Sequence, residues 1–236
     1  MSEKRGSAWL PAIVGGVIGS LMTAGLLFVV WPNLIGERLV RQALLAHPDI
    51  LVATADALRD RQYAPTLAAQ RSTIETPFGS SWKGAAKPDV VMVEFHDYAC
   101  PYCKTSNPIV ERLLSEDKGL RVVYRDLPIL GPASVAAARV ALTASKAGRF
   151  AQFHDAMYAG GRPSPETVAS AARAAGVAPE PAADPQIEAE IKRNFQLAGQ
   201  LGATGTPLFV IGDRVINSAV GYDTLKKAIA DARARG

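Results

Sequence analysis

The chain has 236 residues and a formal net charge of +4, from 26 basic and 22 acidic side chains. This length has room for one ordinary domain and an appendage, and the charge is too small to favour a nucleic-acid surface. Hydrophobic residues make up 48% and charged residues 20% of the chain, a composition that excludes a disordered protein. Two cysteines cannot staple a disulfide-rich scaffold or supply a four-cysteine zinc site. With only three histidines in addition, we expect neither a metal site nor a cofactor.

A membrane segment is predicted close to the N-terminus. Residues 8–31 contain no charged side chain, and as a helix they would span about 36 Å, enough to cross a hydrocarbon core of about 30 Å. Trp9 and Trp31 lie near its ends, where interfacial aromatic residues are expected. The alternative is a cleaved signal peptide, which has a shorter apolar region followed by a small-residue cleavage site. The long run without such a site favours an uncleaved single-pass anchor, with residues 1–7 as a cytoplasmic tail.

An amphipathic helical stalk is predicted over residues 32–70. Apolar residues recur there at helical spacing with a break at Pro48, which indicates two short helices. Their apolar stripe either packs on the main domain or pairs with copies of itself, so residues 33–62 are a candidate region for homo-oligomerisation. Residues 71–88 are rich in Ser, Thr, Gly and Pro and are predicted to form a linker.

From residue 89 onward the pattern is that of an α/β domain. Residues 90–95 (VVMVEF) form an apolar run broken only by Glu94, which predicts a buried strand. A helix, a second strand, a long alanine-rich helical block, a hairpin of two strands and a terminal helix follow, over residues 100–115, 120–124, 134–202, 208–211, 214–217 and 224–235. The sequence therefore predicts a small sheet covered by helices, with a large helical insertion.

The segment Cys100-Pro101-Tyr102-Cys103 carries the predicted chemistry. A C-x-x-C at the start of a helix places two sulfurs one turn apart, close enough to bond. Unpaired N–H groups at the helix N-terminus favour the thiolate of Cys100, and Pro101 loses no hydrogen bond in the first turn. We expect Cys100 to be exposed and to exchange, and Cys103 to be shielded one turn deeper. A zinc half-site and an inert structural disulfide are the alternatives, but the preceding strand and following helix favour a redox dithiol.

Residues 94–103 (EFHDYACPYC) resemble the active-site segment of DsbA-family thiol–disulfide oxidoreductases. The triplet GTP at residues 205–207, directly before a predicted strand, resembles the cis-proline loop of thioredoxin folds. Residues 44–50 (LLAHPDI) also resemble the N-terminal region of the ScsC-like and Com1-like branch. The resemblance implies an α/β, thioredoxin-like fold over residues 89–236, with the family's helical insertion at about 133–203.

The resemblance implies a role for each matched residue. Cys100 is the nucleophile that carries the mixed disulfide, and Cys103 is the resolving thiol. Pro207 is in cis and faces the sulfurs, while the Thr206 backbone pairs with the extended chain of the substrate. Substrate contact is also assigned to the two residues between the cysteines, Pro101 and Tyr102.

Glu94 lies at the position of the family's buried acid. Burying a carboxylate in an apolar strand costs free energy unless the group has a catalytic role or an ion-pair partner. Burial also raises the pKa of the group, so we expect Glu94 to relay a proton for Cys103. An exposed edge or a salt bridge is the alternative for this residue. His96 either tunes Cys100 or points to solvent as a loop histidine, and His154 is expected to pack inside a helix.

The resemblance to the DsbA family implies that the protein is a thiol–disulfide oxidoreductase that acts on cysteines of exported proteins. An oxidase would form disulfides and be reoxidised by a quinone-linked membrane partner. An isomerase or reductase would be kept reduced by a membrane thiol donor, and the stalk and the Thr before the cis-proline lean towards this direction without deciding it. A membrane-tethered copper-binding or chaperone module with two thiolate ligands is the less favoured alternative.

The charges around the membrane segment do not decide its orientation, because two basic residues precede it and two follow it closely. Oxidative folding chemistry belongs outside the cytoplasm. We therefore expect a single-pass protein of the inner membrane with its catalytic domain in the periplasm.

Overall fold

The computed structural model describes Ser20, Met22 and residues 36–235 of the chain. The predicted tail and almost all of the predicted anchor over 8–31 lie outside these residues. Within the part that is described, no helix is both long and apolar enough to cross a membrane. The chain separates into two units, Met1–Leu58 and Arg59–Gly236.

Two helices form the predicted stalk region. Helix α2 spans Glu37–Ala46, and α3 spans Asp49–Glu75, so the predicted break at Pro48 is confirmed. The second helix is much longer than expected and passes through Pro65. Large apolar side chains in the first unit are exposed to solvent, namely Leu39, Val40, Leu45, Ile50, Leu51, Val52 and Leu58.

The prediction of a linker over residues 71–88 is wrong. The end of α3 lies in this segment, and strand β1 (Trp82–Gly84) follows it. Leu67 and Ile74 of α3 are buried in the apolar core of the second unit, so tertiary packing overrides the loop-like composition. Strand β1 adds an antiparallel edge to the sheet, with Trp82 opposite Val123.

The second unit is built on a five-stranded sheet in the order β1-β3-β2-β4-β5. The two central strands, β2 (Val90–His96) and β3 (Leu120–Asp126), are parallel. Strand β4 (Leu208–Ile211) runs antiparallel to β2, and β5 (Arg214–Ile216) completes the hairpin. The predicted strands are all present, and β2 reads as a nearly continuous apolar run because both of its faces are covered.

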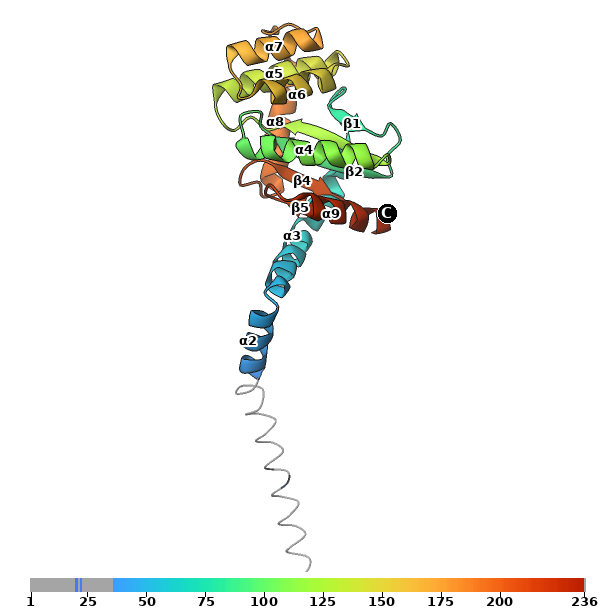
Figure 1. Cartoon of the computed structure of the whole chain (residues 1–236), viewed down its shortest axis with the longest axis vertical. Coiled ribbons are helices and arrows are strands. Elements are labelled where there is room, and N and C mark those ends of the chain that lie inside the picture. Colours follow the sequence, from blue (N-terminus) through green and yellow to red (C-terminus); the bar gives the residue numbers. More distant parts are fainter. Residues whose placement is uncertain (1–19, 21, 23–35, 236) are drawn as a thin grey trace, which may run out of the picture. The chain divides into compact units, whose positions relative to one another are not determined.

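Helices cover both faces of this sheet (Figure 1). Alternate residues of β2 enter different apolar clusters, with Met92 on the face of α4 (Pro101–Glu116) and α9 (Tyr222–Arg235) and Val93 on the face of α3 and α8. The helical insertion consists of α5 (Pro132–Lys146), α6 (Phe150–Gly160), α7 (Pro165–Ala175) and α8 (Pro185–Gln200). Helices α5, α6 and α7 gather at one end of the sheet in Figure 1.

A buried arginine ties α3 and α8 to the sheet. Arg125 of β3 donates to the carbonyls of Thr73, Ile74 and Thr76, which end α3. Its other guanidinium nitrogen donates to Glu190 of α8 at 2.8 Å, and both side chains of this ion pair are almost fully buried. The positive charge also complements the negative end of the α3 dipole.

We expect Arg125→Ala to lower the free energy of unfolding by about 3–5 kcal/mol, because it leaves the buried Glu190 with only the half-exposed Arg193 as a cationic partner. Urea denaturation followed by circular dichroism measures this loss. Arg139→Ala is the matched control, since Arg139 pairs with Glu188 at a half-exposed site, where we expect a loss below about 1 kcal/mol. Equal losses in the two variants would contradict this assignment.

Candidate active site

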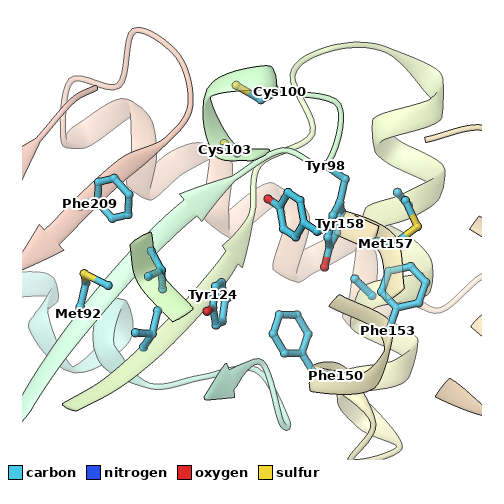
Figure 2. Packing of buried hydrophobic residues seen from close by; sticks show 14 of the residues in the cluster. Met92, Tyr98, Cys100, Cys103, Tyr124, Phe150, Phe153, Met157, Tyr158 and Phe209 are labelled. Carbon is cyan, nitrogen blue, oxygen red and sulfur yellow. The ribbon is translucent and has the colours of Figure 1, made fainter. Parts of the chain in front are cut away.

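The two cysteines lie on the first turn of α4, after the loop that follows β2. Cys100 is the N-cap residue with an extended backbone (φ −76°, ψ 120°), and Pro101 begins the helix. The Cys100 N–H donates to the Asp97 carbonyl at 2.9 Å, and the Cys100 carbonyl accepts from the Lys104 N–H at 3.1 Å. Both cysteines are free thiols. Figure 2 shows Cys100 at the start of the helix with Cys103 deeper towards the sheet.

Both cysteines are buried, with 5% of Cys100 and none of Cys103 exposed. The expectation of an exposed Cys100 is therefore wrong, because the loop that carries Thr206 lies against its sulfur. Burial raises the pKa of the Cys103 thiol far above its usual value, and the charge of Glu94 raises it further. Cys103 therefore keeps its proton until a base accepts it.

The loop before β4 faces the sulfur of Cys100. The Thr206–Pro207 peptide bond is cis, and the Cys100 thiol donates a hydrogen bond to the Thr206 carbonyl at 3.1 Å. The fold thus joins two segments that are 106 positions apart in sequence. Pro101 and Tyr102 are both exposed, and Tyr102 presents 65% of its surface to solvent.

Glu94 lies in the middle of β2, opposite Tyr124 in the register of the sheet. Only 2% of the residue is exposed. Burial raises the pKa of its carboxyl group to about 8, and the charge of Glu111 contributes in the same direction. Glu94 can therefore hold or release a proton near neutral pH, next to a thiol whose own pKa its charge raises.

A polar triad that the sequence analysis missed is centred on Lys83. Lys83 of β1 donates to Glu111 at 2.6 Å and to Asp155 at 2.8 Å. It shares one face of the sheet with Glu94, because it pairs in register with Val122, two positions before Tyr124 on β3. Three residues of α4, α6 and an unpredicted strand make this triad, so no local pattern signalled it.

His96 is completely buried, which corrects the alternative of a solvent-facing loop histidine. It is the last residue of β2, its ring packs edge-on against Tyr98 and Tyr124, and its Nδ1 lies 3.4 Å from the Tyr158 hydroxyl. Burial lowers the pKa of His96 to about 3 and raises the pKa of Asp126, whose Oδ1 lies 3.7 Å from Nε2, well above its usual value. His96 is therefore neutral near pH 7, and a role for His96 in tuning Cys100 stays a prediction.

His154 packs inside the insertion, as the sequence predicts, and it also makes two hydrogen bonds. Its Nε2 lies 3.2 Å from Asn107 Oδ1, which only accepts, so Nε2 donates and Nδ1 accepts from the Tyr98 hydroxyl at 3.2 Å. Burial lowers the pKa of His154 well below its usual value. The rings of Tyr98, Tyr158 and Phe153 cluster below the cysteines in Figure 2.

Asp97 organises the loops around the cysteines and was not singled out in the sequence. Its Oδ1 accepts from the Ala99 N–H at 2.8 Å, and its Oδ2 accepts from the N–H groups of Ile129 and Leu130 at 2.9 Å. The first bond is the local turn that an Asp two residues earlier favours. The other two connect the cysteine loop with the loop that follows β3.

Among the residues that the structure describes, no three His, Cys, Asp or Glu side chains form a group that could hold a metal ion. The two sulfurs, the Thr206 carbonyl and the buried carboxyl group of Glu94 form an arrangement suited to thiol–disulfide exchange.

Several solved structures resemble this chain. A periplasmic thioredoxin-like protein from Salmonella enterica serovar Typhimurium is 32% identical with a TM-score of 0.64, over 70% of this chain and 95% of that protein. A thioredoxin-like oxidoreductase from Silicibacter pomeroyi DSS-3 is 34% identical with a TM-score of 0.64, over 70% and 98% of the two chains. The catalytic domain of Proteus mirabilis ScsC is 26% identical with a TM-score of 0.67, over 72% and 98%.

Curated relatives include longer proteins. The Na(+)/H(+) antiporter NhaA 1 of Salinispora arenicola is 28% identical over 157 residues, which make up 64% of this chain and 24% of the antiporter. The NhaA 3 antiporter of Salinispora tropica matches over 149 residues, 62% of this chain and 20% of that protein. The chain thus spans about a quarter of the length of these curated relatives or less.

The model of the DSBA-like thioredoxin domain matches residues 91–230, which include both cysteines, the cis-proline and the whole insertion. The expected α/β, thioredoxin-like fold with a helical insertion is confirmed. The chain belongs to the DsbA-like thioredoxin family of thiol–disulfide oxidoreductases.

Proposed function

We propose that the protein exchanges disulfides with cysteines of exported proteins through Cys100 and Cys103, and that it forms or reshuffles their bonds. One observation carries this proposal. The Cys100 thiol lies at the N-terminus of α4 and 3.1 Å from the Thr206 carbonyl of a cis-proline loop, with Cys103 buried one turn below. A sulfur at a helix N-terminus is stabilised as a thiolate, and hence as a leaving group.

In the oxidising direction the chain begins as the Cys100–Cys103 disulfide. A substrate thiolate attacks Cys100, the bond between the two cysteines breaks, and Cys103 leaves with the electron pair and takes up a proton. A second substrate thiolate then attacks the substrate sulfur of the mixed disulfide and releases Cys100 as a thiolate. The substrate dithiol is oxidised by two electrons, and the enzyme disulfide is reduced to two thiols.

In the reshuffling direction the reduced Cys100 thiolate attacks a wrong disulfide of the substrate. Another thiolate of the substrate then attacks the mixed disulfide, which forms a new substrate disulfide and releases Cys100. Alternatively, Cys103 attacks Cys100 and releases a reduced substrate. The Thr before Pro207 and the exposed apolar side chains of α2 support this direction, whereas the shared DsbA-like domain supports oxidation equally well. We therefore propose both directions, and the assay below separates them.

Glu94 is proposed to carry the proton of Cys103. When Cys103 attacks, its buried thiol must lose a proton to a group that is also buried. A carboxyl group with a pKa of about 8 accepts this proton in its charged form, and it returns the proton when Cys103 becomes the leaving group. We propose that Lys83, held by Glu111 and the exposed Asp155, connects this exchange with the surface.

The setting of the reaction is also proposed. We infer a single-pass protein of the inner membrane, anchored by residues 8–31, with its catalytic domain in the periplasm. A quinone-linked oxidant would restore the disulfide, or a membrane thiol reductant would restore the dithiol. A membrane-impermeant maleimide that labels Cys100 in intact cells supports this orientation, and labelling only after lysis would overturn it.

The decisive assay supplies the purified full chain with a protein whose disulfides are scrambled, and separately with the same protein fully reduced, in glutathione buffer. Return of native activity from the scrambled form indicates an isomerase, and rapid oxidation of the reduced form alone indicates an oxidase. We expect Cys100→Ser to lose at least about a hundredfold in either activity. A wild-type chain that does neither but binds Cu(I) would instead favour the binding module.

The role of Glu94 predicts the pH dependence of the resolving step. The rate at which Cys103 releases a mixed disulfide should rise with pH through about 8 in the wild type, as Glu94 becomes charged. Glu94→Gln should slow this step by roughly a hundredfold at pH 8 and remove the transition. Rapid-quench mass spectrometry of the mixed disulfide measures the rate.

Glu111→Gln provides the matched control for Glu94. It removes a nearby negative charge that raises the pKa of Glu94, so the transition should move below pH 8 without a loss of the plateau rate. A transition that stays at the same pH in Glu111→Gln, or persists in Glu94→Gln, would assign the ionisation to another group.

Oligomerisation through residues 33–62 is proposed from the apolar side chains that α2 and the first part of α3 expose. Seven of them are between 43% and 74% exposed, which is unusual for a helix that stays alone in water. We expect sedimentation of the full chain in detergent to give more than one copy. Leu39→Ser combined with Leu45→Ser should shift it towards the monomer, and a monomeric wild type would contradict the proposal.

A further inference from the structure

A surface hollow of about 400 Å³ opens directly beside Cys100. The cysteine loop, the first turn of α4, Leu130 and the turn between α6 and α7 line it. Most of its lining is apolar, and the charged side chains among the described residues that line it are Lys104 and Arg162. The hollow therefore combines an apolar floor with a positive rim.

The two cations of this rim have different surroundings, because Lys104 also lines a second hollow with Glu111 and Asp155, whereas Arg162 does not. Lys104 and Arg162 are exposed, and within the described part of the chain neither takes part in an ion pair. Lys83 of β1 is by contrast held by Glu111 and Asp155. The positive charge beside Cys100 is thus available to a molecule bound in the hollow.

The position of the hollow fits one side of a reacting substrate chain. The Thr206 carbonyl lies against the sulfur of Cys100, whereas the walls of the hollow come from the cysteine loop, Leu130, Gly161 and Arg162. A substrate cysteine bonded to Cys100 therefore has the cis-proline loop on one side and the hollow on the other. A residue next to that cysteine is the part of the substrate that can reach Lys104 and Arg162.

Resting on the proposed thiol–disulfide exchange, we propose that this hollow is a specificity subsite, in which Lys104 and Arg162 select substrates with an acidic residue next to the reacting cysteine. The apolar floor receives the aliphatic part of an Asp or Glu side chain, and the rim binds its carboxylate. A Lys at the same place in the substrate is repelled. The expected preference for acid over base is about three- to tenfold at low salt, as for exposed ion pairs, and falls as ionic strength rises.

The test uses the purified full chain in its disulfide form and peptides that contain two cysteines. Asp, Asn or Lys occupies the position before or after the first cysteine. Each turnover oxidises one peptide dithiol to its disulfide and reduces one enzyme disulfide to the dithiol. Chromatography of the peptides gives initial rates, and the rate of each peptide with hydroxyethyl disulfide corrects for the intrinsic reactivity of its thiol.

Lys104→Gln combined with Arg162→Gln should bring the Asp-to-Lys rate ratio close to one. Arg173→Gln combined with Lys192→Gln is the matched control, because both residues are exposed, lie on α7 and α8, and remove the same total charge. This control should keep the preference of the wild type.

The inference is overturned if the wild type oxidises the three peptides at equal corrected rates, or if both double variants change the ratio equally. A preference for large apolar residues that survives loss of the two cations would also overturn it. Failure to oxidise any peptide, including the Asn series, would instead overturn the proposed function itself.

Discussion

Cys100 and Cys103 lie on one helical turn, and the first turn of α4 gives their sulfurs opposite surroundings. Cys100 lies at the positive end of the helix and faces the Thr206 carbonyl of the cis-proline loop. Cys103 is fully buried one turn deeper in the domain. Burial makes the Cys103 thiol a very weak acid. The remaining polar architecture follows from this constraint, because a sealed thiol can enter a redox cycle only if a neighbouring group exchanges protons with it.

The sheet supplies that group on the same face. Glu94, His96, Tyr124 and Asp126 all point from β2 and β3 towards α4 and the insertion, since paired residues of parallel strands share a face. The helical insertion covers these polar side chains with aromatic rings, which keeps His96 and His154 neutral. The insertion therefore sets the low dielectric in which Glu94 acquires its high pKa, besides forming one wall of the hollow.

Much of this arrangement could be predicted from local sequence, and the part that could not depends on distant contacts. The apolar run of β2 and the C-x-x-C before a helix carry their own signals. Strand β1 does not, because three residues show no period and Trp82 becomes a strand residue only through its pairing with β3. The extension of α3 beyond Pro65 likewise depends on the burial of Ile74 and on the buried charge of Arg125. His96 lies at the end of an apolar strand, but its burial also depends on rings from distant segments, namely Tyr124 of β3 and His154 and Tyr158 of the insertion.

Charged side chains of both signs surround the cysteines. Negative groups lie beneath and behind them, where Glu111 and Asp155 share Lys83 and where the charge of Glu111 raises the pKa of Glu94. Positive groups lie in front, where Lys104 and Arg162 edge the opening beside Cys100. The two sets meet at Lys104, which also lines a second hollow together with Glu111 and Asp155. Arg162 lines the hollow beside Cys100 but not the second one, so a change at Arg162 alters what approaches Cys100 and leaves the surroundings of Glu111 as they are.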